Sequence, residues 1–150
     1  MPDIRPFVPA DQLAARRLIL EGLGEHFGVI DETCNSDLDD ITATYVTPGH
    51  RFLVVEDVAW LIGTGALVIE NASVGRIVRI SIAPAWRRRG LARQVLQCLI
   101  ADARAAGLTR LWVETNDDWL AAINLYRAAG FQEYDRRDGS VYLAFDLPRT

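Results

Sequence analysis

The stretch "IVRISIAPAWRRRGLARQVLQCLI", residues 77–100, carries the clearest structural signal in the chain. It opens on a β-branched run that predicts a strand ending at Pro84. From Leu91 onward, apolar residues recur at helical spacing, and Gly107 marks the end of that helix. Between the strand and the helix stands Arg87-Arg88-Arg89-Gly90. The sequence therefore predicts a short basic loop at the amino end of a helix.

Such a loop is suited to holding phosphate. The first amides of a helix lack backbone partners and lie at the positive end of its dipole, which attracts phosphate groups. Gly90 has no Cβ, so an anion can approach the backbone closely, and the arginines add charge and bidentate donors. An exposed turn without a ligand is the alternative that the loop alone leaves open. The Walker and dinucleotide-binding patterns are absent, because a second glycine and a Gly-Lys-Ser/Thr run are missing.

The rest of the chain alternates strand and helix signals. Gly22 and Gly24 are expected to end the first helix, and Glu56-Asp57 is expected to form a tight turn between two strands. Strands are predicted at 4–7, 51–57, 59–70, 75–84, 110–116, 131–136 and 141–147, and helices at 11–23, 36–44, 91–106 and 118–129. This order predicts an α/β (α+β) fold in one domain over residues 1–150, a mixed sheet with helices on both faces.

Composition narrows the class of protein. The chain has 150 residues, half of them hydrophobic, and a formal net charge of −4. A nucleic-acid partner is not expected, because such binders are usually basic overall. The two cysteines, Cys34 and Cys98, are too few for a secreted scaffold, and no signal peptide or membrane span is visible, so a cytoplasmic location is expected. His26 and His50 stand apart from any ligand motif, so no metal is expected.

Two motifs together resemble a known family. Arg87-x-x-Gly90-x-Ala92, after "ISIAPAW", is similar to the Q/R-x-x-G-x-G/A acyl-CoA loop of the GNAT superfamily of N-acetyltransferases. "AINLYRAAGF", residues 122–131, resembles the second signature of that family. The resemblance implies a GNAT fold, with a mostly antiparallel mixed sheet of about seven strands flanked by about four helices, in which the fourth and fifth strands splay apart. It also implies acetyl-CoA as co-substrate.

The same resemblance implies where the co-substrate binds. The fourth-strand backbone at residues 80–82 is expected to contact the pantetheine arm, and the amides of the loop the pyrophosphate. Many relatives carry an asparagine seven residues before the motif tyrosine, where this chain has Trp119, so two nearby asparagines are considered as substitutes; helix capping and plain solvation are their alternatives. The candidate cofactor-binding residues are Ile80, Ser81, Ile82, Arg87, Arg88, Arg89, Gly90, Leu91, Ala92, Asn116 and Asn124.

Acetyl transfer to an amine also needs a proton donor and a proton acceptor. Tyr126 matches the tyrosine of the family, and a phenol is protonated at neutral pH, so it is the candidate general acid. Some relatives place a glutamate eleven residues before the loop, but this chain has Arg76 there, which cannot take a proton; it could lower the pKa of a nearby ammonium or hold an anionic group. Glu114 is the candidate base, acting through water, and Glu70 is the alternative.

The sequence thus predicts an N-acetyltransferase that moves an acetyl group from acetyl-CoA to a primary amine of a small molecule or peptide by direct transfer. An acyl-CoA-binding or sensing domain with little catalysis is the alternative, and a nucleic-acid binder with steep salt dependence is a third. The acidic segment 31–40, after Glu25 and His26, is placed by the resemblance beside the acceptor groove. It could favour a cationic amine or be a solvated loop. Edge strands near the C-terminus suggest a homodimer.

Overall fold

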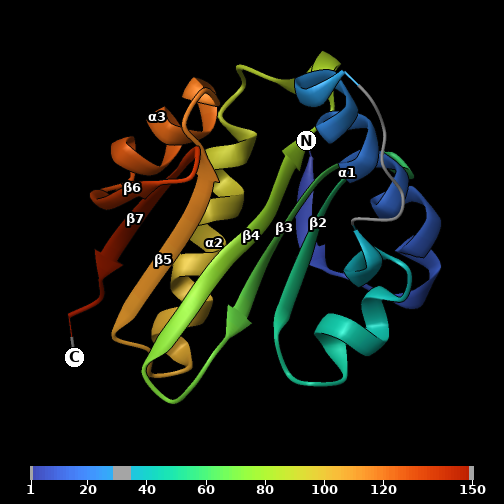
Figure 1. Ribbon diagram of the computed structural model, residues 1–150. Helices are drawn as coiled ribbons and strands as arrows, with labels where there is room; N and C mark the ends of the chain where they lie inside the picture. The colour runs from blue at the N-terminus through green and yellow to red at the C-terminus, as the bar shows by residue number, and fades with distance from the viewer. Residues whose placement is uncertain (1, 29–34, 149–150) are drawn as a thin grey trace.

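A mixed sheet of seven strands runs through the part of the chain that the structure describes, with helices on both faces (Figure 1). The computed structural model describes residues 2–28 and 35–148. The strand order is β1-β2-β3-β4-β5-β7-β6, and only β4 and β5 run parallel. The strands are β1 (Asp3–Pro6), β2 (Arg51–Asp57), β3 (Trp60–Ile69), β4 (Val74–Ile82), β5 (Arg110–Asn116), β6 (Gln132–Arg137) and β7 (Ser140–Asp146). The predicted α/β (α+β) sheet is confirmed.

Three α-helices and a π-helical segment flank this sheet in the described residues. The helices are α1 (Gln12–Phe27), α2 (Leu91–Ala105) and α3 (Leu120–Ala128), the π-helical segment is Thr42–Val46, and short 3-10 turns occupy Pro9–Asp11, Ser36–Leu38 and Pro84–Trp86. Counting the π-helical segment, this agrees with the expected four helices.

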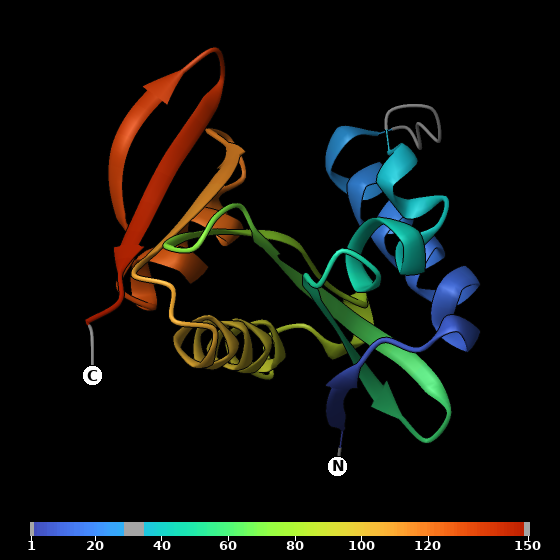
Figure 2. The same cartoon turned by 90° about the horizontal axis from the view of Figure 1, so that it is seen from below.

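The helices divide between the two faces of the sheet (Figure 2). α1 crosses one face, where Gly22 lies so close to β4 that a Cβ there would stand 2.9 Å from Ser81 Oγ. α2 lies against the other face, and a Cβ on Gly65 of β3 would collide with Val95. α3 shares the α2 side, because Ile123 belongs to the same buried cluster. Glycine therefore allows close helix packing on each side.

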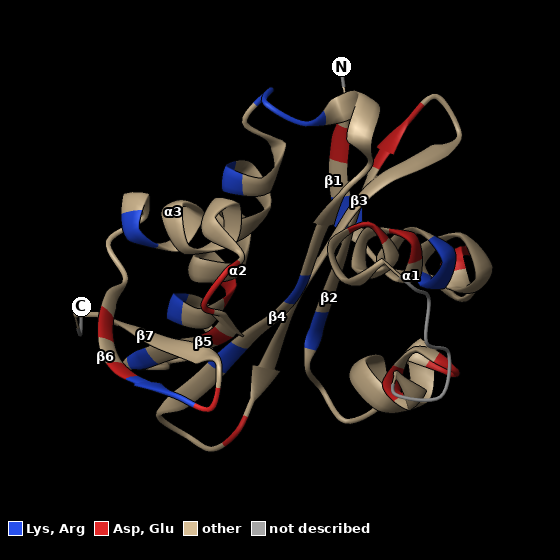
Figure 3. Ribbon diagram, turned by 45° about the horizontal axis from the view of Figure 1, so that its top comes forward, with Lys and Arg blue, Asp and Glu red and all other residues tan. Residues whose placement is uncertain are grey.

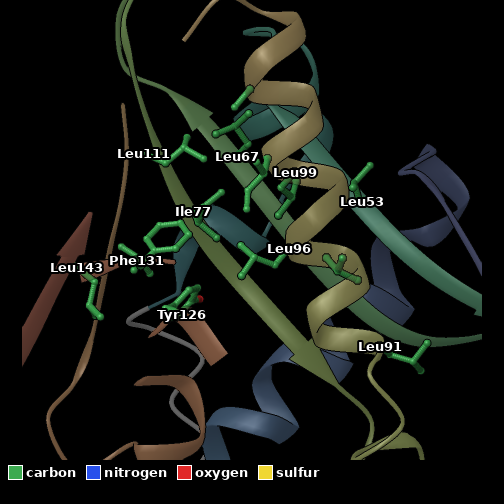
Figure 4. Close-up of a cluster of buried hydrophobic side chains, with 14 of the residues drawn as sticks. Leu53, Leu67, Ile77, Leu91, Leu96, Leu99, Leu111, Tyr126, Phe131 and Leu143 are labelled. Atoms are coloured by element: carbon green, nitrogen blue, oxygen red, sulfur yellow. The ribbon is translucent and has the colours of Figure 1, made fainter. Parts of the chain in front are cut away.

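The hydrophobic core on the α2 face supports the basic loop before α2 and the segment 122–131. Figure 4 shows Leu96 and Leu99 of α2 facing Leu67 and Ile77 of the sheet, with Tyr126 nearby. The apolar residues that recur at helical spacing from Leu91 onward are the ones that α2 buries. Its largest side chains are fully enclosed, and each such leucine contributes about 1.5–3 kcal/mol by burial. The helix that follows the basic loop is thus held firmly against the sheet.

A β-bulge interrupts the pairing of β3 with β4. Thr64 pairs with Ser81 and Ala66 with Val78, so Gly65 alone opposes two residues of β4. The extra residue is accommodated at Arg79, whose φ of 59° is left-handed, and Thr64 Oγ1 donates a 2.8 Å hydrogen bond to its carbonyl. Bulges of this kind re-aim side chains.

The bulge determines which residues of β4 share a face of the sheet. Uninterrupted alternation would set Arg76 with Ile80 on one face and Arg79 on the other. Instead, Ile80 and Ile82 pack in the cluster under α2 with Ile77, while Arg79 contacts the α1 side, as Arg76 does. The bulge brings the two arginines to the same side of the sheet.

Three local predictions were wrong. The β2–β3 turn is Val58-Ala59, both left-handed, and Glu56 and Asp57 pair within the hairpin instead. α1 continues through Gly22 and Gly24 and ends at Gly28, because its packing on the sheet outweighs the weak propensity of glycine. The single helix expected at 36–44 is a 3-10 turn followed by the π-helical segment.

Two further features concern membrane-spanning helices and the edges of the sheet. Among the described residues, no helix is both long and apolar enough to cross a membrane. β6 forms one edge of the sheet, which is the kind of strand on which the homodimer prediction rests. Association itself stays a prediction.

Candidate functional site

The gap between β4 and β5 opens a cleft through the molecule. The two strands share three ladder pairs, ending at Arg76 with Trp112, and then diverge. Along the described part of β4 beyond Arg76, the edge that faces β5 has no ladder partner. A cleft of about 1160 Å³ follows the gap, and it is lined from α1, β4, the start of α2, β5 and α3. The splayed strands and the predicted loop thus border one space.

The loop before α2 presents backbone donors to this cleft. Gly90 is the N-cap of α2 with a φ of 79°, and it supplies no side-chain oxygen to the first amides of the helix. A Cβ added to Gly90 would meet nothing within 4 Å, so the backbone lies open. Arg88, at φ 62°, is also left-handed. Backbone of this kind at a helix amino end forms an anion-binding concavity.

The three arginines of the loop do different things, although Figure 3 shows them as one basic segment leading into α2. Arg87 braces the loop: its Nε donates to the Ile82 carbonyl at 3.0 Å, and its Nη1 lies 2.7 Å from Glu25 on α1. Arg89 stacks over Trp86, with its guanidinium carbon 4.8 Å from the ring centroid. Arg88 lines the cleft. The backbone and Arg88 are therefore better placed toward an anion than Arg87 or Arg89.

Tyr126 of α3 borders the cleft from the α2 side of the sheet. Its side chain is 6% exposed and packs edge-on against Phe131. Burial raises the pKa of its phenol above the ordinary value of 10.0. The phenol is therefore held in its protonated form, as a proton donor needs to be.

Glu114 of β5 lies in the same cleft but is engaged by several donors. Its Oε1 is 3.3 Å from Arg76 Nη2, and its Oε2 accepts from Ser140 Oγ at 2.9 Å and from Tyr142 OH at 3.3 Å. Glu70, the alternative base, accepts a 2.6 Å hydrogen bond from the Trp112 indole. Both carboxylates line the cleft and both are positioned by neighbours.

A partly buried polar cluster on the α1 side was not predicted from the sequence. Arg79 forms a two-point contact with Asp37, at 3.0 and 2.6 Å, and Tyr45 OH donates to the same carboxylate at 2.6 Å. Burial opposes ionisation of Asp37, but the hydrogen bonds from Arg79 and Tyr45 outweigh it and lower its pKa below 3.8. No local signal joins residues 42 positions apart in the chain; only the bulge aims Arg79 at Asp37.

Trp119 also lines the cleft, in a setting that the sequence did not indicate. Its ring stacks on His26 of α1, with centroids 4.1 Å apart and planes 8° from parallel. His26 Nε2 lies 3.2 Å from Asp118 Oδ1, just before α3. α1 and α3 therefore meet across one mouth of the cleft.

The cleft unites most of the sequence-predicted residues but not all. Those that line it are Ile80, Ser81, Ile82, Arg87, Arg88, Gly90, Leu91, Ala92, Glu114 and Tyr126. Arg89, Asn116 and Asn124 are not among the lining residues, and Asn124 is exposed. Of the acidic segment, Asp37 lines the cleft, while residues 31–34, Cys34 included, lie outside the described residues.

Comparison with known sequences fits this geometry. The sequence profile of the acetyltransferase (GNAT) family matches residues 16–131. The chain belongs to this family. The match spans both motifs, the splayed strands and the cleft between them.

The individual GNAT relatives of this chain have low sequence identity to it. It is 28% identical over 140 residues to the uncharacterized N-acetyltransferase YjgM of Escherichia coli, covering 89% of this chain and 84% of that protein. It is 31% identical over 116 residues to an IAA acetyltransferase of Azospirillum brasilense, covering 77% and 75%. The PaiA N-acetyltransferase of Thermoplasma acidophilum in complex with coenzyme A has a similar fold, with a TM-score of 0.86, 13% identity, and 98% and 99% coverage.

The GNAT chain is therefore an acetyl-CoA-dependent N-acyltransferase. The site fits that co-substrate: the strand gap, the uncapped amides after Gly90 and the absence of a Cβ leave room and donors for an elongated phosphate-bearing molecule. Among residues 2–28 and 35–148, no cluster of three or more His, Cys, Asp or Glu side chains that could hold a metal ion is found.

Proposed function

We propose that this chain transfers an acetyl group directly from acetyl-CoA to the primary amine of a small molecule or peptide. One observation carries the proposal: the buried phenol of Tyr126 and the positioned carboxylate of Glu114 border the same cleft as the open amino end of α2. In direct transfer to the neutral amine, the nitrogen bonds to the acetyl carbon, the carbon–sulfur bond breaks, the nitrogen loses one proton and the sulfur gains one. An acceptor that arrives as an ammonium must first lose a further proton to the base.

The binding part of the proposal rests on backbone. The amides from Arg87 to Ala92 would hold the pyrophosphate, with Arg88 adding charge, and the unpaired edge at residues 80–82 would hold the pantetheine arm. Arg87 would act by bracing the loop through Glu25. Asn116 and Asn124 stay candidates only, since neither lines the cleft.

The proton transfers are assigned to two groups. Tyr126 would protonate the sulfur, because burial keeps its phenol protonated. An alkyl ammonium has a pKa of about 10.4, so a base that takes its proton is needed at neutral pH. Glu114, acting through a water molecule, is proposed for this step, with Glu70 as the alternative; the three donors around Glu114 fix its position.

A thiol-release assay tests the proposal. The protein and acetyl-CoA are incubated with a panel of amino acids, polyamines, aryl amines and peptides, and free thiol is followed. Direct transfer predicts intersecting initial-velocity lines and no acetylated protein in intact-mass spectra. Parallel lines with an acetylated protein would contradict direct transfer. Acetyl-CoA binding without turnover of any acceptor would instead support the sensing domain.

A further inference from the structure

Arg76 sits at the apex of the cleft. It is the last residue of β4 that pairs with β5, opposite Trp112, and its side chain lies on the α1 side of the sheet. Arg76, Glu114 and Tyr126 line the same space. A group bound by Arg76 would therefore lie beside the groups proposed to move protons.

The guanidinium of Arg76 has N–H donors that make no hydrogen bond within the described chain. Its Nη2 makes one 3.3 Å contact with Oε1 of Glu114. The other oxygen of Glu114 accepts hydrogen bonds from Ser140 and Tyr142. The Nε of Arg76 is buried and has no hydrogen-bond partner. Among the described residues, every other buried side-chain nitrogen or oxygen has one. A guanidinium carries five N–H donors, and a buried donor left unsatisfied is costly. The geometry calls for an acceptor that the described chain does not supply.

The guanidinium of Arg76 lies over an aromatic ring. Its carbon lies 4.6 Å from the centroid of the Trp112 ring. Trp112 is held in turn by its 2.6 Å hydrogen bond to Glu70 and by a near-parallel contact with Tyr142, at 6.4 Å and 21°. Stacking occupies the face of a guanidinium and leaves the donors at its edge available. Two donors at the edge of a guanidinium suit the two oxygens of a carboxylate.

Two other arginines that line the cleft, Arg79 and Arg87, have their donors occupied by groups of the protein. Arg79 uses its Nε and Nη2 on Asp37, and Arg87 uses its Nε and both Nη atoms on Ile82 and Glu25. Both arginines therefore have a structural role, because each joins two segments that are distant in the chain. Arg76 differs because its Nε is committed to nothing in the described chain.

We infer that the acceptor is an amine that also bears a carboxylate, as a free amino acid does, and that Arg76 is the residue that binds this carboxylate. The inference rests on the proposed acetyl transfer. Glu114 and Glu70 flank Trp112 and Arg76 with negative charge, so the ammonium end of such a zwitterion has carboxylates near the anion site. The acceptor class is then set by one side chain at the apex of the strand gap.

Matched acceptors test this inference in the wild-type protein. Each amino acid is compared with its amino alcohol, for example phenylalanine with phenylalaninol, by thiol release from acetyl-CoA. Loss of a charge-assisted two-point contact predicts a kcat/KM about 10- to 150-fold lower for the alcohol, mainly through KM. Equal kcat/KM values for acid and alcohol across the panel would overturn it.

The variant Arg76→Gln should remove this preference by raising KM for the acid much more than for the alcohol, while any loss common to both acceptors reports the contact of Arg76 with Glu114. Arg110→Gln is the matched control, because Arg110 lies in β5 but does not line the cleft. Thermal unfolding checks that each variant folds. If Arg76→Gln lowers activity toward acid and alcohol by the same factor, Arg76 does not read the carboxylate.

A binding readout separates this inference from the proposed function. Calorimetry measures N-acetylphenylalanine binding to the protein saturated with coenzyme A. A Kd raised by Arg76→Gln and unchanged by Arg110→Gln supports carboxylate binding even where no amine is turned over, in which case only the proposed function fails. No change in Kd on Arg76→Gln overturns the inference.

Discussion

The two ends of the cleft are built from different parts of the chain. At one end, consecutive residues from Arg87 to Ala92 present backbone amides at the start of α2. At the other end, Arg76, Glu114 and Tyr126 bring side chains from two strands and a helix. The first end depends on backbone shape, and the second depends on single functional groups. Substitutions should therefore alter co-substrate affinity at one end and turnover or acceptor choice at the other.

The largest effect is expected at the side-chain end, for Tyr126→Phe. Loss of a general acid lowers kcat by about 10²- to 10⁴-fold. The ring still fills its place against Phe131, so the Kd for acetyl-CoA and the thermal stability should stay near wild type. Thiol release and calorimetry measure both quantities. Tyr134→Phe is the control, because Tyr134 is exposed on β6; equal rates for Tyr126→Phe and wild type would move the acid elsewhere.

The pH dependence sharpens the same assignment. Because burial raises the pKa of Tyr126 above 10.0, its phenol loses its proton only at higher pH than a free tyrosine. The wild-type kcat should therefore show no decline from this group between about pH 8 and pH 10. A decline within that range that disappears in Tyr126→Phe would contradict the raised pKa.

The backbone end is tested by Gly90→Asp. A carboxylate at this open position would repel the pyrophosphate, and a charge pair at about 4 Å is worth about 1–4 kcal/mol near a protein surface. We expect the Kd for acetyl-CoA, measured by calorimetry, to rise about 10- to 100-fold. Gly139→Asp is matched, because Gly139 also has a φ of 79° and open space but lies in the β6–β7 turn. Equal shifts in Kd for both variants would show backbone strain and not phosphate contact.

A smaller effect, on the free energy of unfolding, is expected when the ion pair of Arg79 with Asp37 in the cleft wall is removed. Arg79→Met leaves Asp37 half-buried without its cation, and the free energy of unfolding should fall by about 1–3 kcal/mol, less than for a fully buried pair, because the side chains are 19% and 29% exposed. Arg110→Met removes an exposed pair with Asp146 and should cost less than about 1 kcal/mol. Urea unfolding compares them, and similar losses would place Arg79 among ordinary surface residues.

The smallest effect concerns acid stability. The pKa of Asp37 is below 3.8 in the fold, so the unfolded chain takes up a proton more readily, and stability falls as the pH drops through 3.8 and below. Asp37→Asn should flatten part of this fall in urea unfolding between about pH 5 and pH 3. The rest is expected from Asp11, whose pKa is lowered by Arg5. An unchanged pH profile in Asp37→Asn would contradict the role of this pair.

How much could be predicted differs between the two ends as well. The loop, Gly90 and Tyr126 follow from contiguous motifs, and the structure brings them to one cleft. The hairpin turn was misplaced because Glu56 and Asp57 are hydrophilic but still pair in strands. α1 was cut short because its glycines serve close packing, as Gly22 does against Ser81, and not helix termination.

The order of strands and helices, the glycine at the amino end of α2 and the family can be predicted from the chain alone, because each depends on residues that are neighbours in the sequence. Which side chains share the cleft depends on how the strands and helices pack in space. The bulge opposite Gly65 turns Arg79 toward Asp37, and Trp112 stacks under Arg76 from another strand. Such contacts arise from pairing between strands, and the pattern of any one strand does not contain them.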